Sequence, residues 1–186
     1  MIQEVIDHSP CTELELYRGY VRLLSGKPTR IVSWAAIVVS WVMQATRPIH
    51  IEELAVAIAL TPDVSSMTEI HQAMPLSLEK DIKDHLSGLL VIENRLVRVT
   101  SLLVRGALVE DRVIGDRLET DSSITLRCLH YLEVVLGSMQ NEMWRNCVTY
   151  TPSEYNGRNS PEPVLEFLNY ACRFWPVHFL QVGQPD

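Results

Sequence analysis

The chain has 186 residues and a formal net charge of −7, and 47% of its residues are hydrophobic. This is the composition of a globular protein with a real core, long enough for one large domain or two small ones. Because non-specific binding to nucleic acid depends on Lys and Arg side chains that displace counterions, the acidic balance disfavours DNA and RNA as partners.

The N-terminal part is expected to begin with two helices. Residues 12–15 (Thr-Glu-Leu-Glu) match a capping box, in which a hydroxyl and a carboxylate satisfy backbone N–H groups at a helix start. This helix should run to about Leu24, with a stripe of Leu16, Tyr20 and Leu24 on one face. A second helix is expected over about 29–45. It is apolar nearly all round, which is typical of a central helix covered by its neighbours.

Two shorter helices should follow. Arg47-Pro48 breaks the second helix, and a third helix is expected over about 51–60. Residues 61–75 are a polar connection, long enough to be mobile or partly helical. Ser77 should then cap a fourth helix that ends at Gly88.

After Gly88 the hydrophobic period changes from helical spacing to alternation. Residues 89–93 and 96–100 predict two short strands around a tight turn at Asn94-Arg95. Three helices followed by a small hairpin is the element order of a winged helix. A further helix is expected over about 102–110.

The rest of the chain is predicted to be a helical extension. Residues 111–121 are expected to be a linker or a solvated helix end, after which Ser122 or Ser123 should cap a helix to about Leu136. The expected buried stripe of that helix comprises Leu126, Leu129, Leu132, Val135 and Leu136.

The segment before the last helix is rich in turn-forming residues. Residues 137–159 are irregular in pattern, and the sequence leaves the order of 141–159 open. Residues 151–163 are the best candidate for a disordered loop. Ser160-Pro161 should start the final helix, because Pro is tolerated at the first helical position. Pro176 should kink or end that helix. Its predicted apolar face comprises Leu165, Leu168, Ala171, Cys172 and Trp175.

Three ordered blocks carry a family resemblance. Residues 41–60 place Arg-Pro and Glu-Glu-Leu between two helices, and residues 86–99 place a Gly before two short strands. Residues 129–132 (Leu-His-Tyr-Leu) precede residues 170–179 (YACRFWPVHF). In order and spacing these blocks resemble the winged helix and C-terminal helical region of fungal NACHT-type (STAND) NTPases, a GPI inositol-deacylase-like winged-helix domain. The resemblance does not extend to the family's NTPase core, and His50 stands where the family usually has a capping Thr.

The resemblance implies a function without catalysis. In NACHT-type proteins the winged helix relays nucleotide state between the NTPase and a repeat sensor. We therefore expect a regulatory interaction module that binds protein partners, or a second copy of itself, through helix faces. No cofactor is expected.

No motif predicts a catalytic, metal or DNA-reading centre. Six residues separate Gly19 from Gly26-Lys27, whereas a P-loop needs four. Glu52 and Glu53 lie in the first turn of a helix, where they complement its dipole. None of the six histidines has another ligand at reliable metal-binding spacing. The face of the fourth helix carries more acids than lysines, which disfavours phosphate contacts: Glu79, Lys80, Asp81, Lys83 and Asp84.

The remaining candidate is a groove between the winged helix and the C-terminal helices. Its aromatic residues fall mostly on buried stripes, so core packing is their expected use. If an organic ligand binds, we expect it in this groove. The alternative function is therefore a small all-helical enzyme or small-molecule-binding protein. The residues expected to line the groove are Trp41, His50, Tyr131, Trp175 and His178.

The expected location is cytoplasmic. The N-terminus lacks the pattern of a secretory signal, and the longest apolar run, residues 34–43, is too short to span a bilayer. The four cysteines contain no CxxC pair, which is typical of reduced thiols. We thus predict a mainly α protein with a winged-helix domain over 12–110 and a packed helical extension over 120–182.

Overall fold

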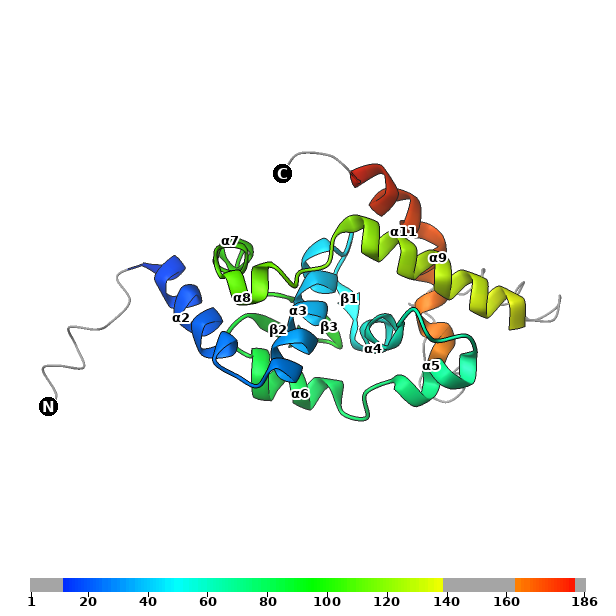
Figure 1. Cartoon of the computed structure of the whole chain (residues 1–186), viewed down its shortest axis with the longest axis horizontal. Helices are drawn as coiled ribbons and strands as arrows, with labels where there is room; N and C mark the ends of the chain where they lie inside the picture. Colours follow the sequence, from blue (N-terminus) through cyan, green and yellow to red (C-terminus); the bar gives the residue numbers. More distant parts are fainter. Residues whose placement is uncertain (1–11, 139–162, 183–186) are drawn as a thin grey trace, which may run out of the picture.

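The computed structural model describes residues 12–138 and 163–182 (Figure 1). Most of these residues are helical, and three short strands form one antiparallel sheet, which confirms the mainly α fold class. Within these ranges no helix combines the length and hydrophobicity needed to cross a bilayer. The predicted loop at 151–163, the region 141–159 and the expected helix start at 160–161 lie outside the described residues, except that Pro163 begins a 3₁₀ turn.

The first helix, α2 (Glu13–Ser25), opens with the predicted capping box. The backbone N–H of Glu15 donates to Thr12 Oγ1 at 3.2 Å, and the N–H of Thr12 donates to the Glu15 carboxylate at 3.0 Å. Its buried residues are Tyr17, Val21 and Leu24. The predicted stripe of Leu16, Tyr20 and Leu24 is therefore wrong at two positions, since Leu16 and Tyr20 are 41% and 40% exposed.

Contacts with distant segments select the buried face of α2. The helix packs against α7 (Leu103–Glu110), where the Arg18 guanidinium donates two hydrogen bonds to the Glu110 carboxylate at 2.7 and 3.0 Å. On another side, the Tyr20 ring covers Gly88 so closely that an added Cβ would lie 2.6 Å from it. Glycine at position 88 therefore permits this approach.

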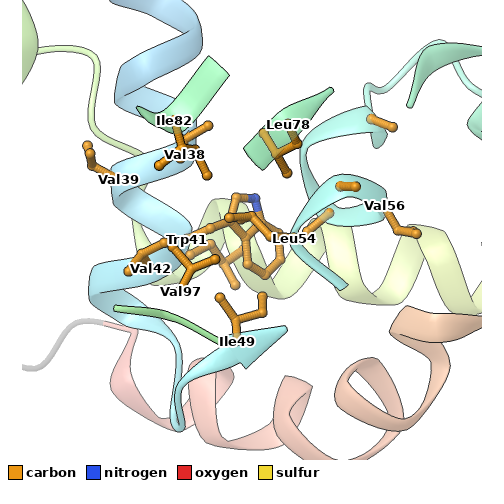
Figure 2. Close-up of a cluster of buried hydrophobic side chains, with 14 of the residues drawn as sticks. Val38, Val39, Trp41, Val42, Ile49, Leu54, Val56, Leu78, Ile82 and Val97 are labelled. Carbon is orange, nitrogen blue, oxygen red and sulfur yellow. The ribbon is translucent and has the colours of Figure 1, made fainter. Parts of the chain in front are cut away.

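The central helix is α3 (Thr29–Gln44), as predicted from its apolar character on all sides. Trp41 of α3 is fully buried, and its indole lies at the middle of a cluster of aliphatic side chains from the neighbouring elements (Figure 2). The labelled members that surround it are Val38, Ile49, Leu54, Leu78, Ile82 and Val97. The core of the protein is thus centred on one helix.

A three-stranded sheet lies beside α3, in the order β1 (Ile49–His50), β3 (Leu96–Val99), β2 (Leu90–Glu93). The predicted hairpin is confirmed: Leu90 pairs with Val99 and Glu93 with Leu96. Both turn residues, Asn94 and Arg95, have positive φ, at 51° and 64°, as a type I′ turn requires. β1 lies outside the prediction, because two residues carry no alternation to detect.

Three helices lie between the first and second strands. They are α4 (Ile51–Ala59), α5 (Met67–Ala73) and α6 (Leu78–Leu86). α5 falls within the polar connection at 61–75. This connection is therefore partly helical, which is one of the two outcomes predicted from the sequence. Ser77 precedes α6, but its side chain makes no capping hydrogen bond, contrary to prediction.

The segment after α7 is packed in part rather than wholly solvated. It contains α8 (Arg112–Gly115), whose first N–H groups from Val113 and Ile114 donate to Asp111 Oδ1 at 2.9 and 3.1 Å. Ile114 is fully buried. The expectation of a linker or a solvated helix end at 111–121 therefore holds in part: Arg112, Asp116 and Arg117 are exposed, whereas the buried Ile114 docks a short helix that was not expected.

The C-terminal pair consists of α9 (Asp121–Ser138) and α11 (Leu168–Gln181), the latter preceded by a 3₁₀ turn, η2 (Pro163–Phe167). The cap of α9 is Thr120 rather than Ser122 or Ser123, since the N–H of Ser123 donates to Thr120 Oγ1 at 3.3 Å. Pro176 lies inside α11 and does not end it.

The buried face of α9 also differs from the prediction. Its most deeply buried apolar residues are Ile124, Cys128, Tyr131 and Val135, whereas Leu126 is 66% exposed. Leu129 and Leu136 are exposed as well. Of the predicted stripe, Val135 is fully buried and Leu132 half-buried. Because α9 is apolar on two faces, the sequence pattern alone does not identify the inner one.

Candidate functional site

Aromatic side chains fill the seam between α3 and the C-terminal pair. The Phe167 ring lies at the centre, with ring centroids 5.5 Å from Trp41, 5.1 Å from Tyr131 and 5.3 Å from Tyr170. All four side chains are fully buried. These separations are those of favourable edge-to-face and offset-stacked pairs. The seam is therefore a tightly packed part of the core rather than an open groove.

A chain of hydrogen bonds crosses the same seam. Asp121 Oδ1 lies 3.2 Å from His178 Nδ1, and His178 Nε2 lies 3.0 Å from the Tyr170 hydroxyl. The Tyr170 oxygen also accepts the backbone N–H of Thr46 at 3.4 Å. Together these groups link the start of α9, the end of α11 and the turn between α3 and β1.

The protonation pattern of this chain follows from its geometry. Burial raises the pKa of Tyr170 to about 12, so its hydroxyl keeps its proton at neutral pH. In the tautomer with an unprotonated Nε2, the hydroxyl donates to His178 Nε2 and Nδ1–H donates to Asp121. A carboxylate on one ring nitrogen fixes the tautomer on the other. The donors and acceptors of His178 are thereby used within the protein.

A second polar contact clamps the turn before α4. The Arg47 guanidinium donates to both Glu53 oxygens, at 2.9 and 2.5 Å, and the Glu53 carboxylate also accepts the N–H of His50 at 2.9 Å. Glu53 is buried, so this two-point charged contact is a strong one. The guanidinium also lies 5.4 Å from the Tyr170 ring centroid, which is within cation–π range.

The structure distributes the five predicted groove residues unevenly. Trp41, Tyr131 and His178 meet in the seam, joined through Phe167 and Tyr170, and all three are fully buried. Trp175 is half-buried and contacts Phe179 on the next turn of α11. His50 lies in β1, beside the Arg47–Glu53 contact.

A cavity of about 450 Å³ does lie between the N-terminal elements and the C-terminal pair, but other residues line it. The end of α3, the end of α7 and α8 form one wall, and the first residues of α9 and the last of α11 form the other. Asp121 is the one member of the hydrogen-bonded chain that lines this cavity. Its other polar side chains are Gln44, Arg105, Glu119, Thr120, Ser122 and Gln181.

A second hollow, of about 630 Å³, lies over α6 and the hairpin turn. Its charges are already paired in part, since Lys83 Nζ lies 2.6 Å from Glu79 and Arg95 contacts Glu52. The lining holds as many acids as bases, so it offers no phosphate footprint.

Several functional side chains escaped sequence reasoning. Phe167 and Asp121 are central to the seam but are not indicated by the sequence, because their partners lie far away in the chain, whereas Tyr170 is expected only to pack in the core. Tyr170 and Thr46 are 124 positions apart. Arg47 was noted only with Pro48 as a helix break, although the acid six positions later, Glu53, was a signal for the pair that forms.

The outer face of the C-terminal pair, unlike the buried seam, carries apolar side chains that are exposed to solvent. We define the outer face as Leu126, Leu129 and Leu136 of α9 with Cys172, Trp175 and Phe179 of α11. Phe179 is 58% exposed, and the other members apart from Trp175 are also exposed. Within residues 12–138 and 163–182 no cluster of His, Cys, Asp and Glu is suited to a metal ion.

Comparison with known proteins returned no match: no protein-family model, no curated protein and no solved structure is similar to this chain.

Proposed function

We propose that this chain is a non-catalytic protein-interaction module, in which a winged helix is joined rigidly to a helical pair that docks a partner. The order α3, β1, α4, α6, β2, β3, with the sheet order β1-β3-β2, supports the winged-helix part of this proposal. α5 is then an insertion between its second and third helices. The resemblance to the relay domain of NACHT-type proteins favours a regulatory role.

The observation that carries the proposal is the outer face of α9 and α11. Soluble monomers rarely expose contiguous apolar patches larger than a few hundred Å² unless the patch binds something. Here exposed leucines and a phenylalanine lie on two helices that pack against each other (Figure 1). The inner side of the same helices is sealed in the seam, so this pair presents apolar surface on a rigid support.

The chemistry of the seam favours binding over catalysis. Tyr170 and His178 are fully buried and hydrogen-bonded to each other, which leaves neither free to meet a substrate. Burial also raises the pKa of the Cys128 thiol to about 12, so it is not a thiolate at neutral pH. The Asp-His-Tyr chain is therefore best understood as a structural link.

A second candidate function rests on one specific observation. The cavity of about 450 Å³ lies between the two parts of the protein and includes Asp121. Its size falls within the range of small-molecule sites. On this alternative, the chain is a small helical enzyme or ligand-binding protein, and occupancy of the cavity would be sensed through Asp121 and His178.

The proposal is tested by comparing the proteins that co-purify with the full chain from its native cells. Leu129→Glu and Phe179→Glu place a charge on the outer face, and Leu23→Glu, at a 72% exposed position on α2, is the matched control. We expect partners present with the wild type and the control to be lost with both outer-face variants. An unchanged set of partners, with all variants equally well folded by circular dichroism, would contradict it.

A further inference from the structure

We propose that the occupant of the outer face is a second copy of this chain, so that two α9–α11 pairs form an antiparallel four-helix bundle. The inference rests on the proposed interaction function and names its partner. Four observations carry it: the direction of the apolar residues, their spacing, the charges around them and the area they offer.

The apolar residues of both helices point to one side. Asp121 at the start of α9 contacts His178 near the end of α11, and Tyr131 contacts Phe167, so the helices are antiparallel. Leu129 and Leu136 lie about 80–100° round α9 from the buried Cys128. The same rotation, in the same sense, separates Cys172 and Phe179 from the buried Ala171 on α11. Leu129 lies about 160° round α9 from the core-facing Tyr131, and Cys172 lies about 160° round α11 from the core-facing Tyr170, so both sets point away from the core.

The spacing of these residues is that of helices which pack on further helices. On α11 the intervals alternate between four and three, which is the heptad pattern of bundle interfaces. The residues in this series are Leu168, Cys172, Trp175, Phe179 and Val182. Within one chain Leu168 is buried and Trp175 half-buried, whereas Cys172, Phe179 and Val182, the residue after the end of α11, are exposed. On α9, Leu129, Leu132 and Leu136 continue the pattern with intervals of three and four.

The charges that border the outer face suit a copy of itself. Glu133 on α9 and Arg173 on α11 are exposed, and within residues 12–138 and 163–182 neither has an ion-pair partner. One acid and one base leave the face electrically neutral on a chain whose net charge is −7. A second copy would bring one acid and one base to the same face, so the charges on the face itself do not oppose the pairing.

The area of the face sets the expected affinity. α9 has 18 residues, which gives a length of about 27 Å, and two helices side by side are roughly 20 Å wide. Because α11 has only 14 residues, or about 21 Å, the footprint is about 480 Å² per copy and about 960 Å² in total, just below the roughly 1,000 Å² of a stable specific interface and in the range of a weak one. We expect a reversible dimer of micromolar or weaker affinity.

The test is sedimentation velocity of the full chain over a concentration series, with hydrogen exchange at the two ends of the series. The wild type should shift from monomer to dimer, and exchange should slow only in α9 and α11 as the dimer forms. Leu129→Glu and Phe179→Glu should each weaken the dimer at least about tenfold, whereas Leu23→Glu should leave it unchanged.

The outcomes separate this inference from the function on which it rests. A wild type that stays monomeric throughout, or protection that appears outside α9 and α11, overturns the second copy as occupant. If the co-purification experiment then still shows a different protein lost with Leu129→Glu, the interaction function stands with another partner. If neither experiment responds to the outer-face variants, both proposals are wrong.

Discussion

The two faces of the C-terminal pair use the same kind of residue for different purposes. On the inner face, Phe167 and Tyr131 pack at centroid distances near 5 Å and are fully buried. On the outer face, Leu126 and Phe179 are equally apolar but remain exposed. The difference shows that hydrophobic character predicts that a residue will be in contact, but it does not predict which surface the residue will contact. The contact is intramolecular only where α3 and α4 supply a surface of matching shape.

The largest effect that could break this comparison is the loss of the ring at the centre of the seam. Phe167→Ala should lower the free energy of unfolding by about 3–5 kcal/mol, because it leaves a cavity among three aromatic side chains. Phe179→Ala on the outer face should change it by less than about 0.5 kcal/mol. Urea unfolding at low protein concentration measures both. Equal losses would mean that the two faces are not distinct.

Alkaline pH should weaken the inner face selectively. An unfolded Tyr loses its proton near pH 10, whereas folded Tyr170 keeps it until about pH 12, so the stability present below pH 10 declines as pH rises through this interval. The contribution of Tyr170 is about 2–3 kcal/mol. Unfolding by urea between pH 9 and 12 measures the decline. The decline should be shallower in Tyr170→Phe than in the wild type. Tyr20→Phe, at an exposed tyrosine, is the control and should decline like the wild type. If Tyr170→Phe declines as steeply as this control, Tyr170 is not the group responsible.

The same comparison between buried and exposed contacts can be made for ion pairs, with Arg47–Glu53 as the buried pair and Arg18–Glu110 as the exposed one. Arg47→Met leaves the buried Glu53 carboxylate without its partner and should cost about 2 kcal/mol, less than a fully buried pair because Arg47 is partly exposed. Arg18→Met, which removes the exposed pair with Glu110, should shift the urea midpoint less. If Arg18→Met proves the more damaging variant, the seam does not depend on the buried contact.

The smallest effect concerns the start of α9. Thr120→Ala removes the side chain that accepts the N–H of Ser123 and should cost about 1 kcal/mol. Ser122→Ala, at a position that the sequence also offered as a cap, should change stability by less than about 0.5 kcal/mol. Thermal unfolding monitored by circular dichroism compares the two. The reverse order would restore Ser122 as the cap.

The positions of the elements were largely predictable, whereas their buried faces were not. The capping box at Thr12, the change of period after Gly88 and the turn at Asn94-Arg95 were all recognised because each depends on neighbours within a few residues. The inner residues of α2 and α9 were misassigned. Both helices carry apolar side chains on two sides, and the choice between them depends on elements distant in the chain, such as α7 for α2.

The candidate site was foreseen only in outline. The sequence pointed to a region between the N-terminal elements and the last helices, and it named Trp41, Tyr131 and His178, which do meet there. It did not indicate Phe167, and it indicated Tyr170 only as a core aromatic residue, although these two rings join the other three. A pattern of aromatic residues shows that packing partners are needed, but not which rings will become neighbours.

The amino-acid sequence by itself determined where helices and the hairpin form, because capping, turn conformation and hydrophobic period act over a few bonds. Only the tertiary structure decided that the hydroxyl of Tyr170 meets the N–H of Thr46, 124 positions away, and that Asp121 orients His178. It also decided which leucines of α9 stay exposed. These outcomes depend on how whole elements pack, and packing is settled by the shape and burial of surfaces that no local stretch of chain contains.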